Sequence, residues 1–141
     1  MIAIGVLAIV AHGGMYALKH IVRANEKGEA RATFESPDKR FKAVLYSANG
    51  GGGISPFCYD SVYVVTSSAE ASNDSQRVYL AGCHSFADHT NGPEVRWLSN
   101  NRLQIRFAAN QGARGVDHLE LKGFAEGGKV VMAYVVNERS F

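Results

Sequence analysis

The segment of residues 83–89 carries the densest group of metal-binding and nucleophilic side chains in the chain. Thiolate, imidazole and carboxylate groups are the ligands that bind zinc in proteins. The segment supplies these groups from Cys83, His84, Asp88 and His89. His118 or Asp117 would complete such a site from a distance. A small metal-dependent hydrolase that uses the loop of His84, Asp88 and His89 is therefore one hypothesis for the function.

The spacing of these residues matches no recognised zinc pattern, and polar residues of this kind are common in a loop after a strand. A cysteine nucleophile, Cys83 or Cys58, activated by His84 or His118, is the second chemical alternative. The chain has no Gly-x-Ser-x-Gly motif, and the glycines at 50–53 lack the Lys-Ser/Thr pair of a phosphate-binding loop. The sequence thus favours a protein without catalytic residues, metal or cofactor.

A β-hairpin is most clearly predicted between residues 94 and 107. Residues 94–98 and 102–107 alternate in polarity, with a Ser-Asn-Asn turn between them. A three-residue turn places Leu98 opposite Arg102, and each further pair follows in step. The expected apolar pairs are Trp97 with Leu103 and Val95 with Ile105, and the expected solvated pair is Glu94 with Arg106.

The solvated face of this hairpin offers the best candidate binding residues, Arg96, Arg102 and Arg106. Arg77 and Arg114 are further candidates for the same surface. Arginine is enriched where proteins dock partners. The alternative is that these charges only keep an edge hairpin from pairing with other chains.

Further strands are predicted at residues 31–35, 40–47, 59–66, 77–82, 117–122 and 129–137. The last two are expected to form a second hairpin through Gly127 and Gly128. Residues 129–137 are apolar on both faces, which predicts a central strand covered on both sides. About eight strands and 15 glycines predict a mainly β fold, an antiparallel β-sandwich or a curved sheet.

Residues 1–22 contain a single formally charged side chain, Lys19. About 20 mostly apolar residues are needed to cross a bilayer as a helix. We therefore expect an N-terminal membrane helix at 1–22, in contact with lipid through residues 2–22, then a linker at 23–30 and one β domain at 31–141. A cleaved signal peptide and a buried helix of the domain are the alternatives.

Two features give opposite predictions for the side of the membrane. Lys19, near the end of the apolar segment, and Arg23, Lys27 and Arg31, which follow it, favour a cytoplasmic domain. Cys58 and Cys83, however, flank two strands that are expected to pair, and this predicts a disulfide, which persists only in an oxidising compartment. We expect the protein to lie in the bacterial inner membrane, with its soluble domain in the periplasm.

Two motifs resemble known families. Residues 36–44 (SPDKRFKAV), and residues 95–105 with Trp97, Leu103 and Ile105, resemble hairpins of six-bladed Tol-type propellers and peptidase propellers. A propeller needs at least four blades, and this chain has material for about two. The motifs are more similar to a group of small, uncharacterised bacterial proteins that carry an N-terminal anchor and one β domain. The resemblance implies this organisation and no activity.

The formal charge of +2 does not indicate a nucleic-acid-binding protein. The sequence favours a non-catalytic, membrane-tethered binding protein of the bacterial envelope with a protein partner. A toxin-immunity protein and an accessory subunit of an envelope complex both fit this description. A hydrolase built on the loop of residues 83–89 is the alternative.

Overall fold

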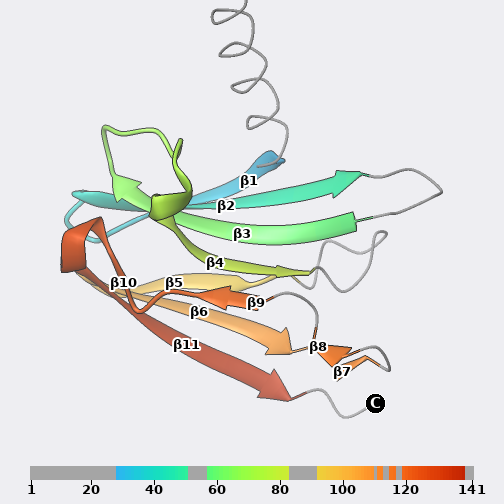
Figure 1. Cartoon of the computed structure of the whole chain (residues 1–141). Helices are drawn as coiled ribbons and strands as arrows, with labels where there is room; N and C mark the ends of the chain where they lie inside the picture. Colours follow the sequence, from blue (N-terminus) through green and yellow to red (C-terminus); the bar gives the residue numbers. More distant parts are fainter. Residues whose placement is uncertain are drawn as a thin grey trace, which may run out of the picture.

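The computed structural model describes residues 28–50, 57–82, 92–109, 111–112, 115–116 and 119–138. Within these ranges the chain is mainly β, as the sequence predicts, and two sheets lie face to face (Figure 1). The predicted membrane helix at 1–22 lies outside the described residues. No helix among the residues that are described has the length and apolar character needed to cross a membrane.

The first sheet has five antiparallel strands. Their order is β1 (Glu29–Glu35), β2 (Phe41–Gly50), β3 (Phe57–Thr66), β4 (Arg77–Gly82) and β9 (Leu119–Leu121). β1 begins inside the predicted linker. A short 3-10 turn, η1 (Asp74–Gln76), lies in the polar segment between β3 and β4.

The second sheet has four strands. Their order is β10 (Phe124–Ala125), β11 (Val130–Glu138), β6 (Arg102–Ala109) and β5 (Glu94–Ser99). β11 runs parallel to β6, whereas the other pairs in this sheet are antiparallel. A separate small sheet pairs β7 (Gln111–Gly112) with β8 (Gly115–Val116).

The Ser-Pro-Asp sequence makes the turn between β1 and β2. The Ser36 hydroxyl accepts a hydrogen bond from the Phe41 amide at 3.0 Å and donates one to Asp38 at 2.7 Å. Lys39 has a φ of 58°, a left-handed conformation that a tight turn requires. The hydrogen bond from Ser36 holds the pKa of Asp38 below its usual value, and Arg40 acts in the same direction. The motif is therefore a structural turn.

The predicted register of the β5–β6 hairpin is confirmed over most of its length. Val95 pairs with Ile105, Trp97 with Leu103, and Glu94 with Arg106. The predicted pairing of Leu98 with Arg102, however, was wrong. Ser99 pairs with Arg102 instead, because the strand bulges between Trp97 and Ser99, and Leu98 is exposed. A bulge of this kind shortens the loop without changing the faces of the pairs beyond it.

The predicted second hairpin was wrong. β9 pairs with β4 in the five-stranded sheet, and β11 pairs with β6 in the other sheet. A 3-10 turn, η3 (Glu126–Gly128), connects β11 only to the two residues of β10. The expectation that β11 is covered on both sides was also wrong, because Val131 is 39% exposed and Val136 is 51% exposed.

The core lies between the two sheets. Val62 and Val64 of β3 and Leu103 and Ile105 of β6 are fully buried there. The outer face of β3 is buried as well, because the segment of residues 67–76 arches over the five-stranded sheet (Figure 1). Tyr63 on this outer face is 2% exposed. One sheet therefore has a cover on its outer face.

The two edges of the sandwich differ in how the sheets are joined. At the β1–β5 edge, the Trp97 indole donates a hydrogen bond to the Phe34 carbonyl at 2.9 Å. At the other edge, the Tyr134 hydroxyl lies 2.6 Å from the Val78 carbonyl and 2.8 Å from the Lys122 carbonyl, and donates to this pair. Burial raises the pKa of Tyr134 to about 12. The ring of Trp97 also packs against the core, as the sequence predicts.

Candidate functional site

Three arginine side chains share one exposed face of the four-stranded sheet. Arg102, Gln104 and Arg106 alternate along β6 and therefore point to the same side. Arg96 of β5 pairs with Gln104, which places it between the other two. The neighbouring residues Trp97 and Leu103 point into the core. We call this surface, Arg96, Arg102, Gln104 and Arg106, the arginine face.

The charge of the arginine face is largely unbalanced. Glu94 lies 3.5 Å from the Arg106 guanidinium, and both side chains are exposed. Ion pairs of this kind contribute about 0–1 kcal/mol. Within the described part of the chain, no acidic side chain lies within ion-pair distance of Arg96 or Arg102. The face therefore has two arginines available to an anionic partner.

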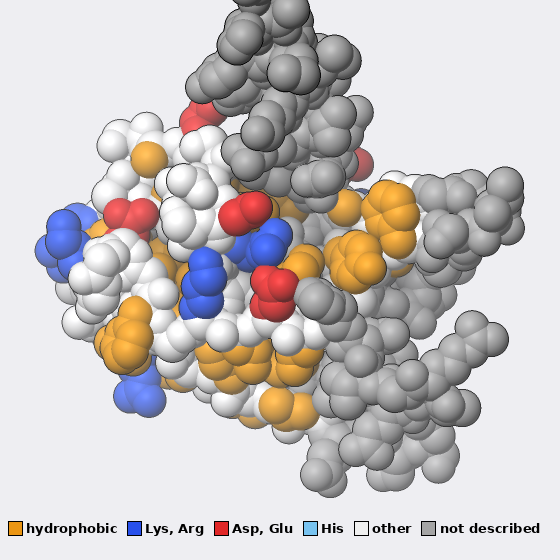
Figure 2. Space-filling view, viewed as in Figure 1, with side chains coloured by type: hydrophobic (Ala, Val, Ile, Leu, Met, Phe, Trp, Pro, Cys, Tyr) orange, Lys and Arg blue, Asp and Glu red, His pale blue; other side chains and the backbone are white. Residues whose placement is uncertain are grey.

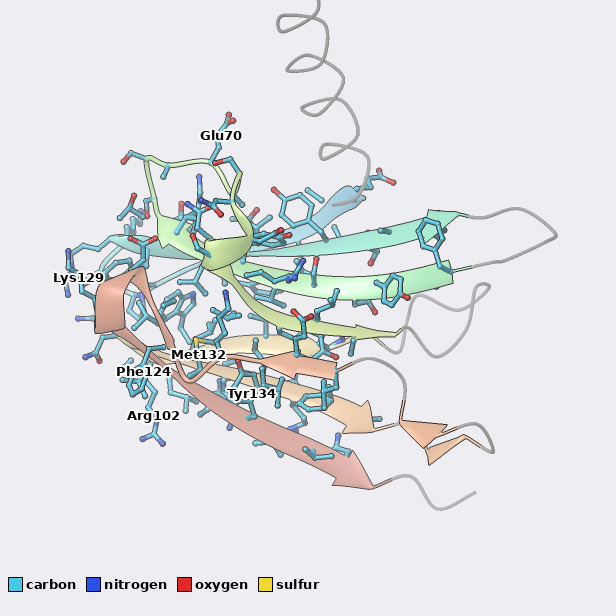
Figure 3. The ribbon with its side chains drawn as sticks, viewed as in Figure 1. Glu70, Arg102, Phe124, Lys129, Met132 and Tyr134 are labelled. Carbon is cyan, nitrogen blue, oxygen red and sulfur yellow. The ribbon has the colours of Figure 1, made fainter. Side chains whose placement is uncertain are left out.

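Apolar side chains border the arginine face along β11. Val131 is in register with Arg102, and Val135 is in register with Arg106, so these residues point to the same side as the arginines. Phe124 of β10 pairs with Val131 and is 62% exposed. Figure 3 shows Arg102 and Phe124 extending from the same end of the four-stranded sheet, away from the other sheet. The surface thus combines positive charge with exposed apolar area, a composition that is typical of docking surfaces.

Arg77, the further arginine candidate, lies on the other sheet. Its guanidinium is 3.0 Å from Glu120 and 3.5 Å from Asp74. Burial raises the pKa of Tyr63, and a hydrogen bond to Arg77 lowers it by a smaller amount. Arg77 is therefore satisfied within the fold. Arg114 lies outside the described residues.

The segment of residues 67–76, here called the covering segment, is fixed at both ends. At its start, the Ser67 amide donates to the Arg40 carbonyl at 3.0 Å. The side chain of Asn73 accepts a hydrogen bond from the Ser75 amide at 3.0 Å, and the Gln76 side chain accepts one from the Asn73 amide, which forms a capping box. Lys122 Nζ donates to the Asp74 carbonyl at 2.9 Å. These contacts hold the carboxylate of Asp74 near Arg77.

The chemical candidates of the loop at residues 83–89 lie outside the described residues, as do His118 and Asp117. Among the residues that the structure describes, no group of three or more His, Cys, Asp or Glu side chains is placed to hold a metal ion. Cys58 is buried. Its predicted partner, Cys83, is outside the described residues, so the pairing of the two stays a prediction.

The apolar border of the arginine face was missed by the sequence analysis. Residues 129–137 are apolar on both faces, and this pattern was interpreted as burial on both faces. The exposed position of Phe124 was not predicted either. β10 comprises only Phe124 and Ala125, and a strand of this length is too short to be recognised from alternating polarity. The only available sequence signal was the Glu-Gly-Gly turn directly after Ala125.

Hydrophobic side chains are also exposed on the side of the molecule where β9 and β11 run (Figure 2). Leu119 and Leu121 of β9 are 38% and 42% exposed.

Comparisons with models of protein families, with curated proteins and with solved structures found no match for this chain.

Proposed function

We propose that this chain is a non-catalytic binding protein of the bacterial envelope. The segment at residues 2–22 tethers it to the membrane, and the β domain docks an acidic surface of a partner protein on the arginine face. A toxin-immunity protein and an accessory subunit of an envelope complex are the two roles that fit this description.

One observation carries the docking proposal. The β5–β6 register brings Arg96 between Arg102 and Arg106, and among the residues that the structure describes only Arg106 has an acidic neighbour, Glu94. The Cα atoms of Arg102 and Arg106 are about 13 Å apart, from the rise of an extended strand. A partner surface with two carboxylates at a similar spacing would match the row of arginines on β6. Complementary charge chiefly sets the rate and the orientation of docking.

We further propose that Cys58 pairs with Cys83 and that the domain lies in the periplasm. Support comes from Tyr59 and Gly82, the residues next to these cysteines, which are paired across β3 and β4. Alkylation of the full-length chain from intact cells, before and after reduction, tests the pairing. Labelling of both thiols only after reduction is expected. Labelling without reduction contradicts the pairing and the periplasmic placement together.

Photocrosslinking in intact cells tests the docking proposal. A photoreactive amino acid replaces Gln104 at the centre of the arginine face, and in a second protein it replaces Thr33, an exposed position on the other sheet. We expect one discrete protein adduct from position 104 and none of the same size from position 33. Absence of an adduct at 104, or the same adduct at both positions, contradicts the proposal.

Charge reversal identifies the contribution of the arginines. The variant Arg102→Glu with Arg106→Glu should lose the adduct from position 104. The variant Arg31→Glu is the matched control, because Arg31 is an exposed arginine on β1, in the other sheet. Exposed substitutions usually change stability by less than about 0.5 kcal/mol, so thermal unfolding should be unchanged in both variants. Retention of the adduct in the double variant would remove the arginines from the docking surface.

A further inference from the structure

The edge of β11 that faces away from β6 is paired over only its first residues. β10 pairs with Val130 and Val131, and the Met132 amide donates to the Gly123 carbonyl at 3.0 Å. In the part of the chain that the structure describes, no strand pairs with this edge beyond Met132. β11 nevertheless continues to Glu138. A free strand edge of this length is a template for pairing with another strand.

The direction of the backbone groups follows from the hydrogen bonds at the start of β11. The Val131 amide donates to Asn101 on the β6 side, whereas the Met132 amide points to the opposite side. Amides alternate in direction along a strand, so those of Tyr134 and Val136 also point to the open edge. The sequence from Val130 to Val136 contains no charged residue and no proline, which are the usual means of blocking an edge.

Within the described ranges, the interior of the sandwich is open along the same edge. Leu119 and Leu121 of β9 pair with the inward-facing residues Ala81 and Tyr79, yet both leucines are exposed. Val136 of β11 pairs with the buried Phe107, yet it is 51% exposed. Figure 3 shows Tyr134 between β9 and β11, at the position of the hydrophobic band in Figure 2. Inward-pointing side chains on β9 and β11 therefore have no apolar cover from the residues that the structure describes.

We propose that an extended segment of the partner protein pairs with the open edge of β11 as an additional strand, and that this segment alternates apolar and acidic side chains. The apolar side chains would cover Leu119, Leu121 and Val136. The acidic side chains would point to the outer face, about 10 Å from the arginine row of β6, which is the distance of two strand spacings. This inference rests on the proposed function, because it specifies the partner of the arginine face.

The charge of the arginine face distinguishes this occupant from a second copy of the chain. The outer face of β11 offers Val131, Ala133 and Val135, and none of these would neutralise the arginines of a neighbouring copy. A separation of about 10 Å is comparable to the Debye length of about 8 Å at physiological salt, so acidic side chains on an added strand still interact with the arginines. Strand addition is also an established mode of peptide recognition.

The probe for the test is a capped eight-residue peptide of alternating valine and glutamate. It is titrated into the isotope-labelled full-length chain in detergent, and amide chemical shifts and hydrogen exchange are followed by NMR. We expect the shifts to concentrate at residues 133–137, and the Tyr134 and Val136 amides to become protected. A peptide with every backbone amide methylated should not bind, and a valine–lysine peptide should bind more weakly.

The variant Val136→Pro removes an amide that none of the described strands uses, and proline is tolerated at such edge positions. We expect it to weaken the peptide about tenfold, as loss of one hydrogen bond and its geometry predicts. The variant Val136→Ala keeps the amide and is the matched control. If the proline variant does not fold, protection of the Tyr134 and Val136 amides in the unmodified chain decides the matter.

The outcomes separate this inference from the docking proposal. Shifts confined to the arginine face, unchanged affinity in Val136→Pro, or no peptide binding would overturn the strand-addition proposal, even if the adduct from position 104 is found. Peptide binding at β11 without that adduct would overturn the docking proposal instead. If the chain forms a dimer and Val136→Pro dissociates it, the edge binds a second copy of the chain, and this result would also overturn the inference.

Discussion

Arg77 and Arg102 both point outward from a sheet of this sandwich, but their surroundings differ. Arg77 lies beneath a covering segment that supplies Asp74, and Glu120 of β9 completes its contacts. Arg102 lies on a sheet whose outer face has no comparable cover among the described residues, and it has no acidic neighbour there. The comparison indicates that a covered arginine stabilises the fold, whereas an uncovered one is available to a partner.

The largest expected difference between the two arginines is in stability. The variant Arg77→Met should lower the free energy of unfolding by about 2 kcal/mol, because it removes the hydrogen bond to the buried Tyr63 hydroxyl and the contacts to Glu120 and Asp74. The variant Arg102→Met should change it by less than about 0.5 kcal/mol. Urea unfolding of the full-length chain in detergent measures both. Equal effects in the two variants would contradict the comparison.

The hydroxyl of Tyr63 tests the same covered site with a smaller change. Burial raises the pKa of Tyr63, and the hydrogen bond to Arg77 acts in the opposite direction. The variant Tyr63→Phe removes this hydrogen bond and keeps the ring, so a loss of about 1 kcal/mol is expected. If Tyr63→Phe costs nothing in the Arg77→Met background but about 1 kcal/mol alone, the two groups are coupled. Simple additivity of the two changes would show that they act independently.

Alkaline pH tests the connection between the cover and the four-stranded sheet. Tyr134 donates to the carbonyl of Lys122, whose ammonium group holds the covering segment. Burial raises the pKa of Tyr134 to about 12, above the usual value of 10. Its contribution to stability is therefore complete below pH 10 and is lost as the pH rises toward 12. The stability advantage over the variant Tyr134→Phe should narrow between pH 10 and 12, and a constant difference would contradict this assignment.

The sequence predicted the arginine face because its register depends on local pairs. Val95 with Ile105 and Glu94 with Arg106 each match in polarity or charge, and the turn between the strands is short. The bulge at Leu98 did not disturb the prediction, because it lies beyond the pairs that define the faces. The placement of the arginines was thus predictable from about a dozen consecutive residues.

The open edge of β11 was not predictable in the same way. Its parallel pairing with β6 joins segments that are distant in sequence, and no local pattern encodes which strand becomes its neighbour. The apolar character of both faces was correct evidence for a strand but not for its burial. Val131 is exposed because it lies on the outer face of its sheet, which no described segment covers. Val136 is exposed because β10 pairs only with the start of β11. The missing information was the length of a neighbouring strand.

The smallest expected effect concerns Glu94, whose carboxylate is the acidic neighbour of the arginine face. The variant Glu94→Gln frees Arg106, and it should change stability by less than about 0.5 kcal/mol because the ion pair is exposed. The added positive charge should increase the yield of the adduct from position 104 at low salt, and the increase should disappear at high salt. The variant Glu35→Gln removes an exposed carboxylate from β1 of the other sheet and should leave the yield unchanged. A yield that does not respond to Glu94→Gln at any salt concentration would show that the arginines dock their partner by shape or apolar contact rather than by charge.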